Sequence, residues 1–147
     1  MTEQIFGVED VWAIAEAHNE ERPLFIRYRT GLGPLAGDAR LSNRLTISWP
    51  FEHAADQTGL PEGELSDRMK RFEDAVCATL EGGKLALLTS VWTTSGLREW
   101  VWYGGEKSVL ARAINEALAG MPRLPLHLAI EPDPAWEQYL GFISSVG

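Results

Sequence analysis

Arginine and tryptophan side chains recur at alternate positions in the segments that are most typical of β-strands. Arg27 and Arg29 lie two residues apart in one segment, and Arg98, Trp100 and Trp102 repeat this spacing in another. Residues two apart in a strand point to the same face of a sheet. A guanidinium supplies a fork of N–H donors and an indole supplies a large, stiff contact surface, so both are common at binding sites. We therefore predict a sheet face that binds an anionic or aromatic ligand or a protein partner, lined by Arg27, Arg29, Trp92, Arg98, Trp100 and Trp102.

A purely structural interpretation of these residues is the alternative. Aromatic residues pack well on sheets, and arginine stacked over tryptophan stabilises a solvated face by about 0.5–1 kcal/mol. A core on both sides of the sheet, under the N-terminal segment or a C-terminal helix, would also explain the tryptophans. The two interpretations differ in whether the tryptophan side chains are exposed.

Other residue types that support catalysis are scattered along the chain. Cys77, the single cysteine, lies at the edge of an apolar helix stripe, which is typical of a small buried hydrophobe rather than a nucleophile. His18, His53 and His127 fall on three different elements, without the spacing of zinc ligands. Glu73 borders the same stripe and either turns toward a sheet arginine or lies on a solvated helix face. Because nucleotide-binding glycine motifs and a G-x-S-x-G motif are also missing, we predict no catalytic residue, no metal site and no cofactor.

The elements that would position these residues follow from the apolar periodicity. We expect strands over residues 11–18, 24–29, 45–49 and 126–130, and a hairpin over 84–103 that turns near 94–96. A helix is expected to begin near Pro61 and to end at Gly82 and Gly83, with an apolar stripe of Leu65, Met69, Phe72, Val76 and Leu80.

Two further helices are expected toward the C-terminus. One follows Gly105 and presents apolar residues between Val109 and Leu118 on one face. The other runs from Pro134 to about Ile143, where Asp133 is placed to cap the helix and Pro134 suits the first helical position.

This order of elements predicts an α+β fold in a single domain over residues 1–147. We expect a mostly antiparallel sheet with helices on one face, containing a ferredoxin-like β-α-β-β-α-β unit preceded by a β-hairpin. The strand order is left open. Alternation assigns to the helix-covered face Leu24, Ile26, Leu45, Ile47, Trp49, Val101, Leu126, Leu128 and Ile130, and adds Thr46, Ser48 and Ser90 to the arginine and tryptophan face.

The composition is that of a folded, acidic protein. With 147 residues, of which 45% are hydrophobic, the chain can bury a core without disulfides. The net charge of -8 opposes binding to nucleic acid and to anionic membranes, and it favours a basic protein partner. No apolar run approaches the ~20 residues of a membrane-spanning helix, and the first residues lack the pattern of a signal peptide, so we expect a cytoplasmic protein.

Four segments carry a resemblance to a known family: Pro23–Arg29, Arg71–Asp74, Thr93–Tyr103 and Asp133–Tyr139. Together, and in this order, they resemble the bacterial family called domain of unknown function 695. The resemblance implies a bacterial, intracellular α+β domain to which no reaction is assigned. Some relatives look fused to a domain similar to the protein inhibitor of ribonuclease E, which favours regulation by protein contact.

Two functions are therefore considered. The first is a non-enzymatic regulatory or protein-interaction module, inhibitor-like or immunity-like, that uses the arginine and tryptophan face or its acidic surface. The alternative is an enzyme or a binder of an anionic ligand, in which the three arginines hold the anion and Glu73 or His127 transfers protons. A homodimer formed across the open sheet face is a third option.

Overall fold

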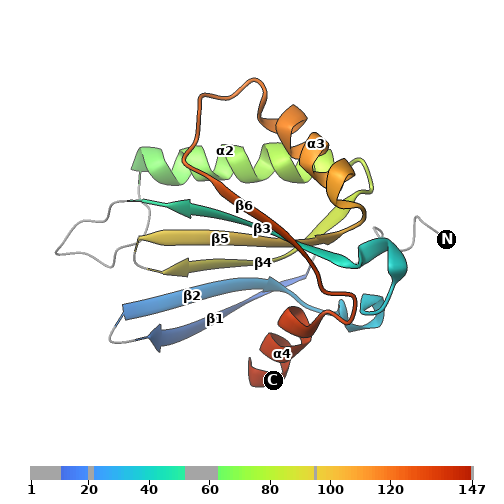
Figure 1. Cartoon of the computed structure of the whole chain (residues 1–147). Helices are drawn as coiled ribbons and strands as arrows, with labels where there is room; N and C mark the ends of the chain where they lie inside the picture. The colour runs from blue at the N-terminus through green and yellow to red at the C-terminus, as the bar shows by residue number, and fades with distance from the viewer. Residues whose placement is uncertain (1–10, 20–21, 52–62, 95, 147) are drawn as a thin grey trace.

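A six-stranded sheet forms the centre of the molecule (Figure 1), with the strand order β1-β2-β4-β5-β3-β6. The computed structural model describes residues 11–19, 22–51, 63–94 and 96–146. The strands are β1 (Trp12–Asn19), β2 (Arg22–Arg29), β3 (Asn43–Pro50), β4 (Ala86–Thr94), β5 (Leu97–Gly104) and β6 (His127–Pro132). The helices are α2 (Gly63–Leu80), α3 (Lys107–Leu118) and α4 (Glu137–Val146), with short 3-10 helices η1 (Gly33–Leu35) and η2 (Ala39–Leu41) before β3.

The predicted α+β fold with a mostly antiparallel sheet is confirmed. Each pair of neighbouring strands in the described part of the chain is antiparallel. Strand β5 lies between β3 and β4, so the two strands that α2 connects are not neighbours. The strand order, which the sequence left open, thus places β1 and β6 at the two edges of the sheet.

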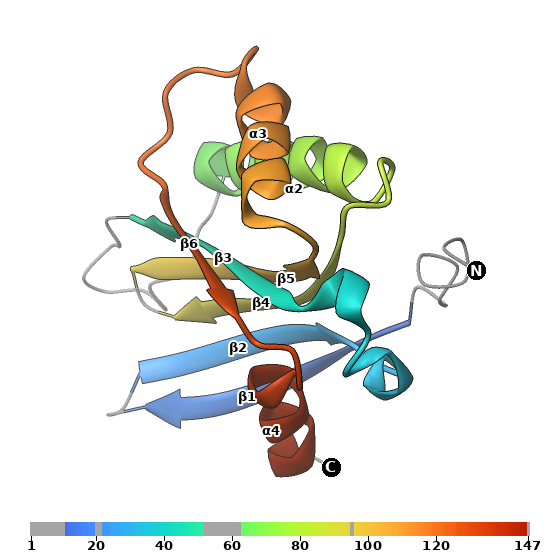
Figure 2. The ribbon, with the colours of Figure 1, turned by 45° about the vertical axis from the view of Figure 1, so that its right-hand side comes forward.

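The helices lie on both faces of the sheet. Helices α2 and α3 share one face, as predicted, but α4 packs on the opposite face (Figure 2). The second face carries its own apolar residues, including Leu87, Val101 and Tyr103. These side chains are shielded from water only if another element packs over them. The prediction of helices on one face therefore requires a correction for α4, which closes a second, smaller core.

The apolar stripe of α2 forms one side of the larger core. Met69, Phe72, Val76 and Leu80 are buried, as the helical periodicity predicted. The Phe72 ring packs against Trp100 of the sheet, with 4.7 Å between the ring centroids. The helix ends at Leu80, slightly before the predicted glycines, and residues 52–62 lie outside the described part of the chain.

The predicted apolar face is right for β3 and β6 but wrong for Leu24, Ile26 and Val101. Val101 pairs with Thr46 and Ile26 pairs with Trp92, so both point away from the face of Leu45 and Ile47. Leu24 lies on the same side as Ile26. Alternation fixes the two faces of each strand, but only the pairing register fixes which face of one strand continues that of the next.

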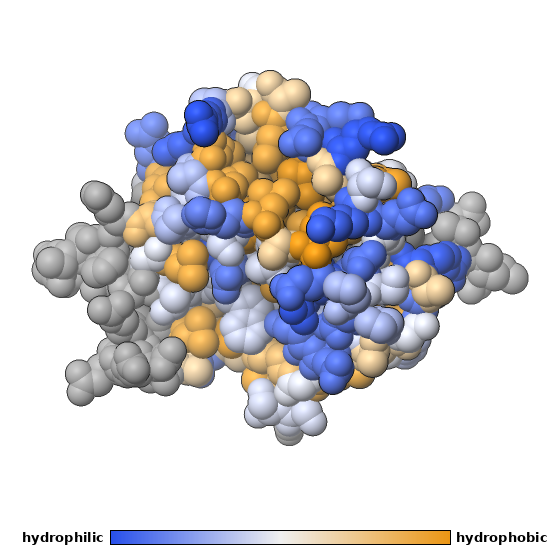
Figure 3. Space-filling model, in the orientation of Figure 1, coloured by the Kyte–Doolittle hydropathy of each residue, from blue (hydrophilic) through white to orange (hydrophobic). Residues whose placement is uncertain are grey.

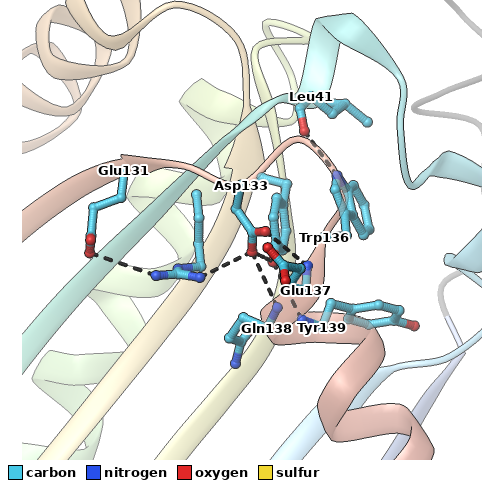
Figure 4. A network of polar contacts seen from close by, with 9 residues as sticks. Leu41, Glu131, Asp133, Trp136, Glu137, Gln138 and Tyr139 are labelled. Atoms are coloured by element: carbon cyan, nitrogen blue, oxygen red, sulfur yellow. Dashed lines mark hydrogen bonds and ion pairs between the residues drawn. The ribbon is translucent and has the colours of Figure 1, made fainter.

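Asp133 fixes the start of α4 (Figure 4). Its carboxylate accepts hydrogen bonds from the backbone N–H groups of Glu137, at 2.8 Å, and Gln138, at 3.2 Å. The Tyr103 hydroxyl donates to it at 2.6 Å and Arg44 at 3.0 Å. The predicted capping role of Asp133 is therefore present, and it also joins the helix to β5 and β3.

The helix begins at Glu137 rather than at the predicted Pro134. Trp136 has a φ of 57°, in the left-handed region, so residues 134–136 form a turn instead of a first helical turn. Its indole N–H donates to the Leu41 carbonyl at 2.9 Å (Figure 4). Its ring stacks on Tyr103 with 4.2 Å between the ring centroids. Burial of the indole between η2 and β5 compensates for this unusual backbone conformation.

Apolar side chains reach the surface where β6 crosses in front of α2 (Figure 3). Leu128 is 46% exposed, whereas Leu126 and Ile130 pack against the larger core. Within the described residues, no helix is both long and apolar enough to cross a membrane.

We predict that Asp133→Ala destabilises the protein by about 3 kcal/mol, because a charged acceptor of several buried or half-buried donors is lost. The free energy of unfolding from urea titration measures the effect. Asp74→Ala is the matched control, since this exposed carboxylate forms a surface pair with Lys70 at 3.6 Å, and a change of no more than about 0.5 kcal/mol is expected. An equal loss in both variants would contradict the role of Asp133.

Stability should also depend on the ionisation of Asp133. Burial raises the pKa of this carboxyl, but hydrogen bonds from Tyr103, Glu137 and Gln138 and the charge of Arg44 bring it below its ordinary value of 3.8. A carboxyl whose pKa is lower in the folded than in the unfolded protein stabilises the fold at pH values above the unfolded-state pKa. This contribution is lost as the pH falls through the folded-state pKa. The difference in unfolding free energy between the wild type and Asp133→Asn should therefore be constant near neutral pH and should shrink below pH 3.8. A difference that stays constant into strong acid would rule out this linkage.

Candidate functional site

Five of the six predicted site residues share one sheet face, and Trp92 lies on the other. Thr93 pairs with Arg98 and Val91 pairs with Trp100, which places Arg98, Trp100 and Trp102 on the side of Arg27 and Arg29. This side is the one that α2 covers. The face that was predicted to be open, with arginine and tryptophan side chains, is therefore partly buried in the hydrophobic core.

Trp100 and Trp102 are buried beneath α2, with no exposed surface. They pack with Phe72, Val76 and the apolar residues of β3, as the structural interpretation expected. The structure thus removes both indoles from direct contact with a ligand.

Glu73 of α2 lies at the centre of the polar contacts at the edge of this core. Its carboxylate accepts hydrogen bonds from the Arg27 guanidinium and, at 2.9 Å, from the Trp100 indole N–H. The Glu73 side chain is 19% exposed and that of Arg27 is 39% exposed. The hypothesis that Glu73 turns toward a sheet arginine is confirmed, and the bond to Trp100 holds the carboxylate in place.

Arg98 lies beside this pair without a carboxylate of its own. Its Nε–H donates to the Thr93 hydroxyl at 2.8 Å, and its guanidinium carbon is 6.0 Å from the Trp100 ring centroid. Within the described part of the chain, Arg98 forms no ion pair. Burial lowers the pKa of Arg98, as does the charge of Arg27, while Glu73 opposes both. The site therefore holds two guanidinium groups and one carboxylate.

Arg27 and Arg98 line a groove over strands β1, β2, β4 and β5, which we call the Arg27–Arg98 groove. It has a cavity volume of about 230 Å³ and is lined by Ile14, Phe25, Ile26, Arg27, Val91, Thr93 and Arg98. Its wall is apolar and its charged groups are cationic. Such a groove suits an anionic group that is carried on an apolar or neutral body.

Arg29 is separate from this groove. Its guanidinium donates to Glu81 at 3.3 Å and its side chain is only 7% exposed. Its carbonyl accepts a hydrogen bond from the Tyr139 hydroxyl at 2.7 Å. Arg29 thus links β2 to α2 and α4 and has a structural role.

Trp92 lies on the opposite sheet face, under α4. Its indole N–H donates to Ser90 at 2.8 Å, and its ring lies 4.9 Å from Phe142. It borders a hollow between β1 and α4. Trp92 therefore cannot act together with Arg27 and Arg98.

Sequence reasoning missed two residues beside the groove. The Arg27 and Arg29 guanidinium carbons lie 5.0 Å and 4.9 Å from the ring centroid of Trp12 in β1. Thr93 orients Arg98 across the hairpin. The alternation of β1 was visible in the sequence, but only its pairing with β2 brings Trp12 to these arginines.

Of the two proposed proton-transfer residues, Glu73 lies beside the arginines and His127 does not. His127 is on β6, where it pairs with Ser48 and faces away from α2, whereas Glu73 is held by Arg27 and Trp100. His53 and the side chain of His18 lie outside the described residues. Among the residues that the structure describes, no group of three or more His, Cys, Asp or Glu side chains could hold a metal ion.

Similarity to known proteins places the chain in one family. Residues 10–144 match a family of unknown function, DUF695. The chain belongs to the DUF695 family. This confirms the resemblance carried by the four segments of the sequence. No curated protein and no solved structure matches this DUF695 chain.

Cys77 should be unreactive in the folded DUF695 protein. Burial, followed by the charges of Glu81 and Glu73, raises the pKa of its thiol to about 12, so almost no thiolate exists below pH 10. We expect labelling by iodoacetamide at pH 8 to be much slower in the native protein than in urea. Comparable rates in the two states would contradict a buried, protonated thiol.

Proposed function

We propose that this DUF695 protein is a non-enzymatic interaction module, inhibitor-like or immunity-like, that acts in the bacterial cytoplasm. It binds an acidic side chain of a partner protein in the Arg27–Arg98 groove. The observation that carries this proposal is Arg98, a half-buried guanidinium in an apolar-walled groove that has no carboxylate partner among the residues the structure describes.

A carboxylate is the group that best complements Arg98. A guanidinium that has lost part of its hydration regains stability by pairing with an anion. Its Nε–H is bound to Thr93, and among the described residues its Nη groups have no hydrogen-bond acceptor. Glu73 accepts from Arg27 and Trp100 through its Oε1, and among the described residues it forms no hydrogen bond or ion pair with Arg98.

A partner protein fits the groove better than a free small molecule. Its volume of about 230 Å³ is below the ~300–1,000 Å³ of typical small-molecule pockets. Beside it, Ile14 is 76% exposed and offers an apolar surface that a single carboxylate would leave uncovered. A side chain that projects from a larger surface would fill the groove and cover Ile14 together.

The charge distribution limits what kind of protein this partner is. The whole net charge of -8 comes from acidic residues in segments 1–10, 20–21 and 52–62, which contain no lysine or arginine. A strongly acidic partner would be repelled by them. We therefore propose a partner with a basic or neutral surface that presents one acidic side chain to Arg98.

The direct test is a titration with a short blocked peptide that contains one glutamate, followed by NMR of the Trp100 indole N–H. We expect weak, saturable shifts with the glutamate peptide and none with its glutamine analogue, because only the carboxylate pairs with the guanidinium. Arg98→Ala should reduce the affinity at least tenfold, whereas Glu73→Gln should increase it by removing the competing carboxylate. Arg112→Ala, on the exposed side of α3, is the matched control.

Two results would overturn the proposal. One is the absence of any shift at saturating peptide, with all variants folded by circular dichroism. The other is an equal response to the glutamine analogue. If inorganic phosphate binds tightly and the peptide does not, the groove belongs to a small-anion binder instead. Trp100→Ala is unsuitable as a probe, because it would open a cavity in the core.

A further inference from the structure

Strand β1 is an edge of the sheet, and its own residues carry none of the features that usually protect an exposed edge. It has eight residues and pairs with β2 without a bulge. Its sequence, WAIAEAHN, contains no proline, glycine, lysine or arginine. Natural proteins use short strands, prolines, lysines or bulges to prevent an exposed edge from pairing with another chain. The opposite edge, β6, is shorter and ends in Pro132.

The exposed apolar residues gather at the same edge. Four of the six large hydrophobic residues that are exposed in the described part of the chain are Val11, Ile14, Leu140 and Val146. The first two lie at or beside β1 and the other two on α4, which approaches β1 from the face opposite α2 (Figure 2). Between the two elements is a hollow of about 600 Å³, lined by residues that include Ala15, Ala17, Phe142 and Val146.

The backbone of β1 determines how another strand can add to it. The Thr30 N–H donates to the Val11 carbonyl, so Val11 belongs to the positions that bond to β2. Because bonding positions alternate along an antiparallel pair, Ala13 and Ala15 also bond to β2. Ile14 and Glu16 therefore direct their backbone N–H and C=O groups outward.

We propose that β1 pairs antiparallel with β1 of a second copy, about a two-fold axis at Ala15. An isologous contact joins two identical edges, and a two-fold axis makes them antiparallel. In this register, Ile14 lies opposite Glu16 of the other copy, and the outward backbone groups of both residues bond across the axis.

The composition of β1 favours a second copy as the occupant. Glu16 is the only Asp, Glu, Lys or Arg of the strand, and a centre at Ala15 prevents the two Glu16 carboxylates from lying directly opposite each other. The small side chains of Ala13, Ala15 and Ala17 lie on the α4 side and leave room there for the α4 of each copy to approach the other. The two sheets become continuous, and the exposed residues of β1 and α4 become buried at one interface.

The first test is light scattering coupled to size exclusion, using the full chain. We expect the wild type to have twice the mass of one chain, and Glu16→Pro to be a monomer. Proline at position 16 removes only an outward N–H, a position where edge strands tolerate it. Glu16→Ala is the matched control, since it removes the charge, keeps the N–H and should remain a dimer.

The second test fixes the register. In a Cys77→Ala background, Ala15→Cys should form an intermolecular disulfide on mild oxidation, because position 15 faces itself across the axis at a spacing that disulfides accept. Ala13→Cys should not, because it faces position 17 and lies about 13 Å from its own copy across the axis.

A monomeric wild type at high micromolar concentration would overturn the proposal. So would a Glu16→Pro variant that is folded and still dimeric, or equal cross-linking of the two cysteine variants. The dimer does not depend on the Arg27–Arg98 groove, so Arg98→Ala should leave the mass unchanged.

Discussion

Burial of β4 and β5 on both faces is the constraint on which the rest of the structure depends. Trp100 and Trp102 of β5 are covered by α2, while Val101 and Tyr103 of the same strand are covered by α4 and the η1–η2 segment. In a strand buried on both sides, each unsatisfied polar group costs about 1–3 kcal/mol. The Trp100 indole N–H and the Tyr103 hydroxyl of β5 are bonded to Glu73 and Asp133, whereas the buried Trp102 indole N–H has no hydrogen-bond acceptor among the described residues. The hairpin therefore anchors both cores, and surfaces available for binding lie toward the edges.

Carboxylates join the helices to this hairpin and its neighbours. Glu73 of α2 and Glu81, directly after this helix, accept hydrogen bonds from Arg27 and Arg29 of β2, and Glu81 also accepts the Leu88 N–H of β4. Asp133 does the same for α4 on the other face. Arg98 differs from these paired groups, because its half-buried guanidinium forms no ion pair with a carboxylate among the described residues. This contrast makes it the best candidate for a contact with another molecule.

The two proposed surfaces lie at the β1–β2 end of the sheet, where helices cover least. The Arg27–Arg98 groove opens beside Ile14, and the outward backbone groups of Ile14 and Glu16 lie at the adjacent edge. A groove and an edge strand recognise different chemistry, a single anion in one case and an extended backbone in the other. Within the DUF695 fold, these features offer functions that need no catalytic residue.

The sequence by itself determined the local features: the six strands, the buried stripe of α2 and the capping role of Asp133. Each depends on residues a few positions apart, or on a periodicity within one element. Tertiary structure alone decided that Trp100 and Trp102 are core residues, that Val101 faces α4, and that Arg27 and Arg98 share a groove while Trp92 does not. A period of two leaves each strand two equivalent orientations, and the register, shifted in β4 between Leu88 and Ser90, chooses between them through contacts distant in sequence.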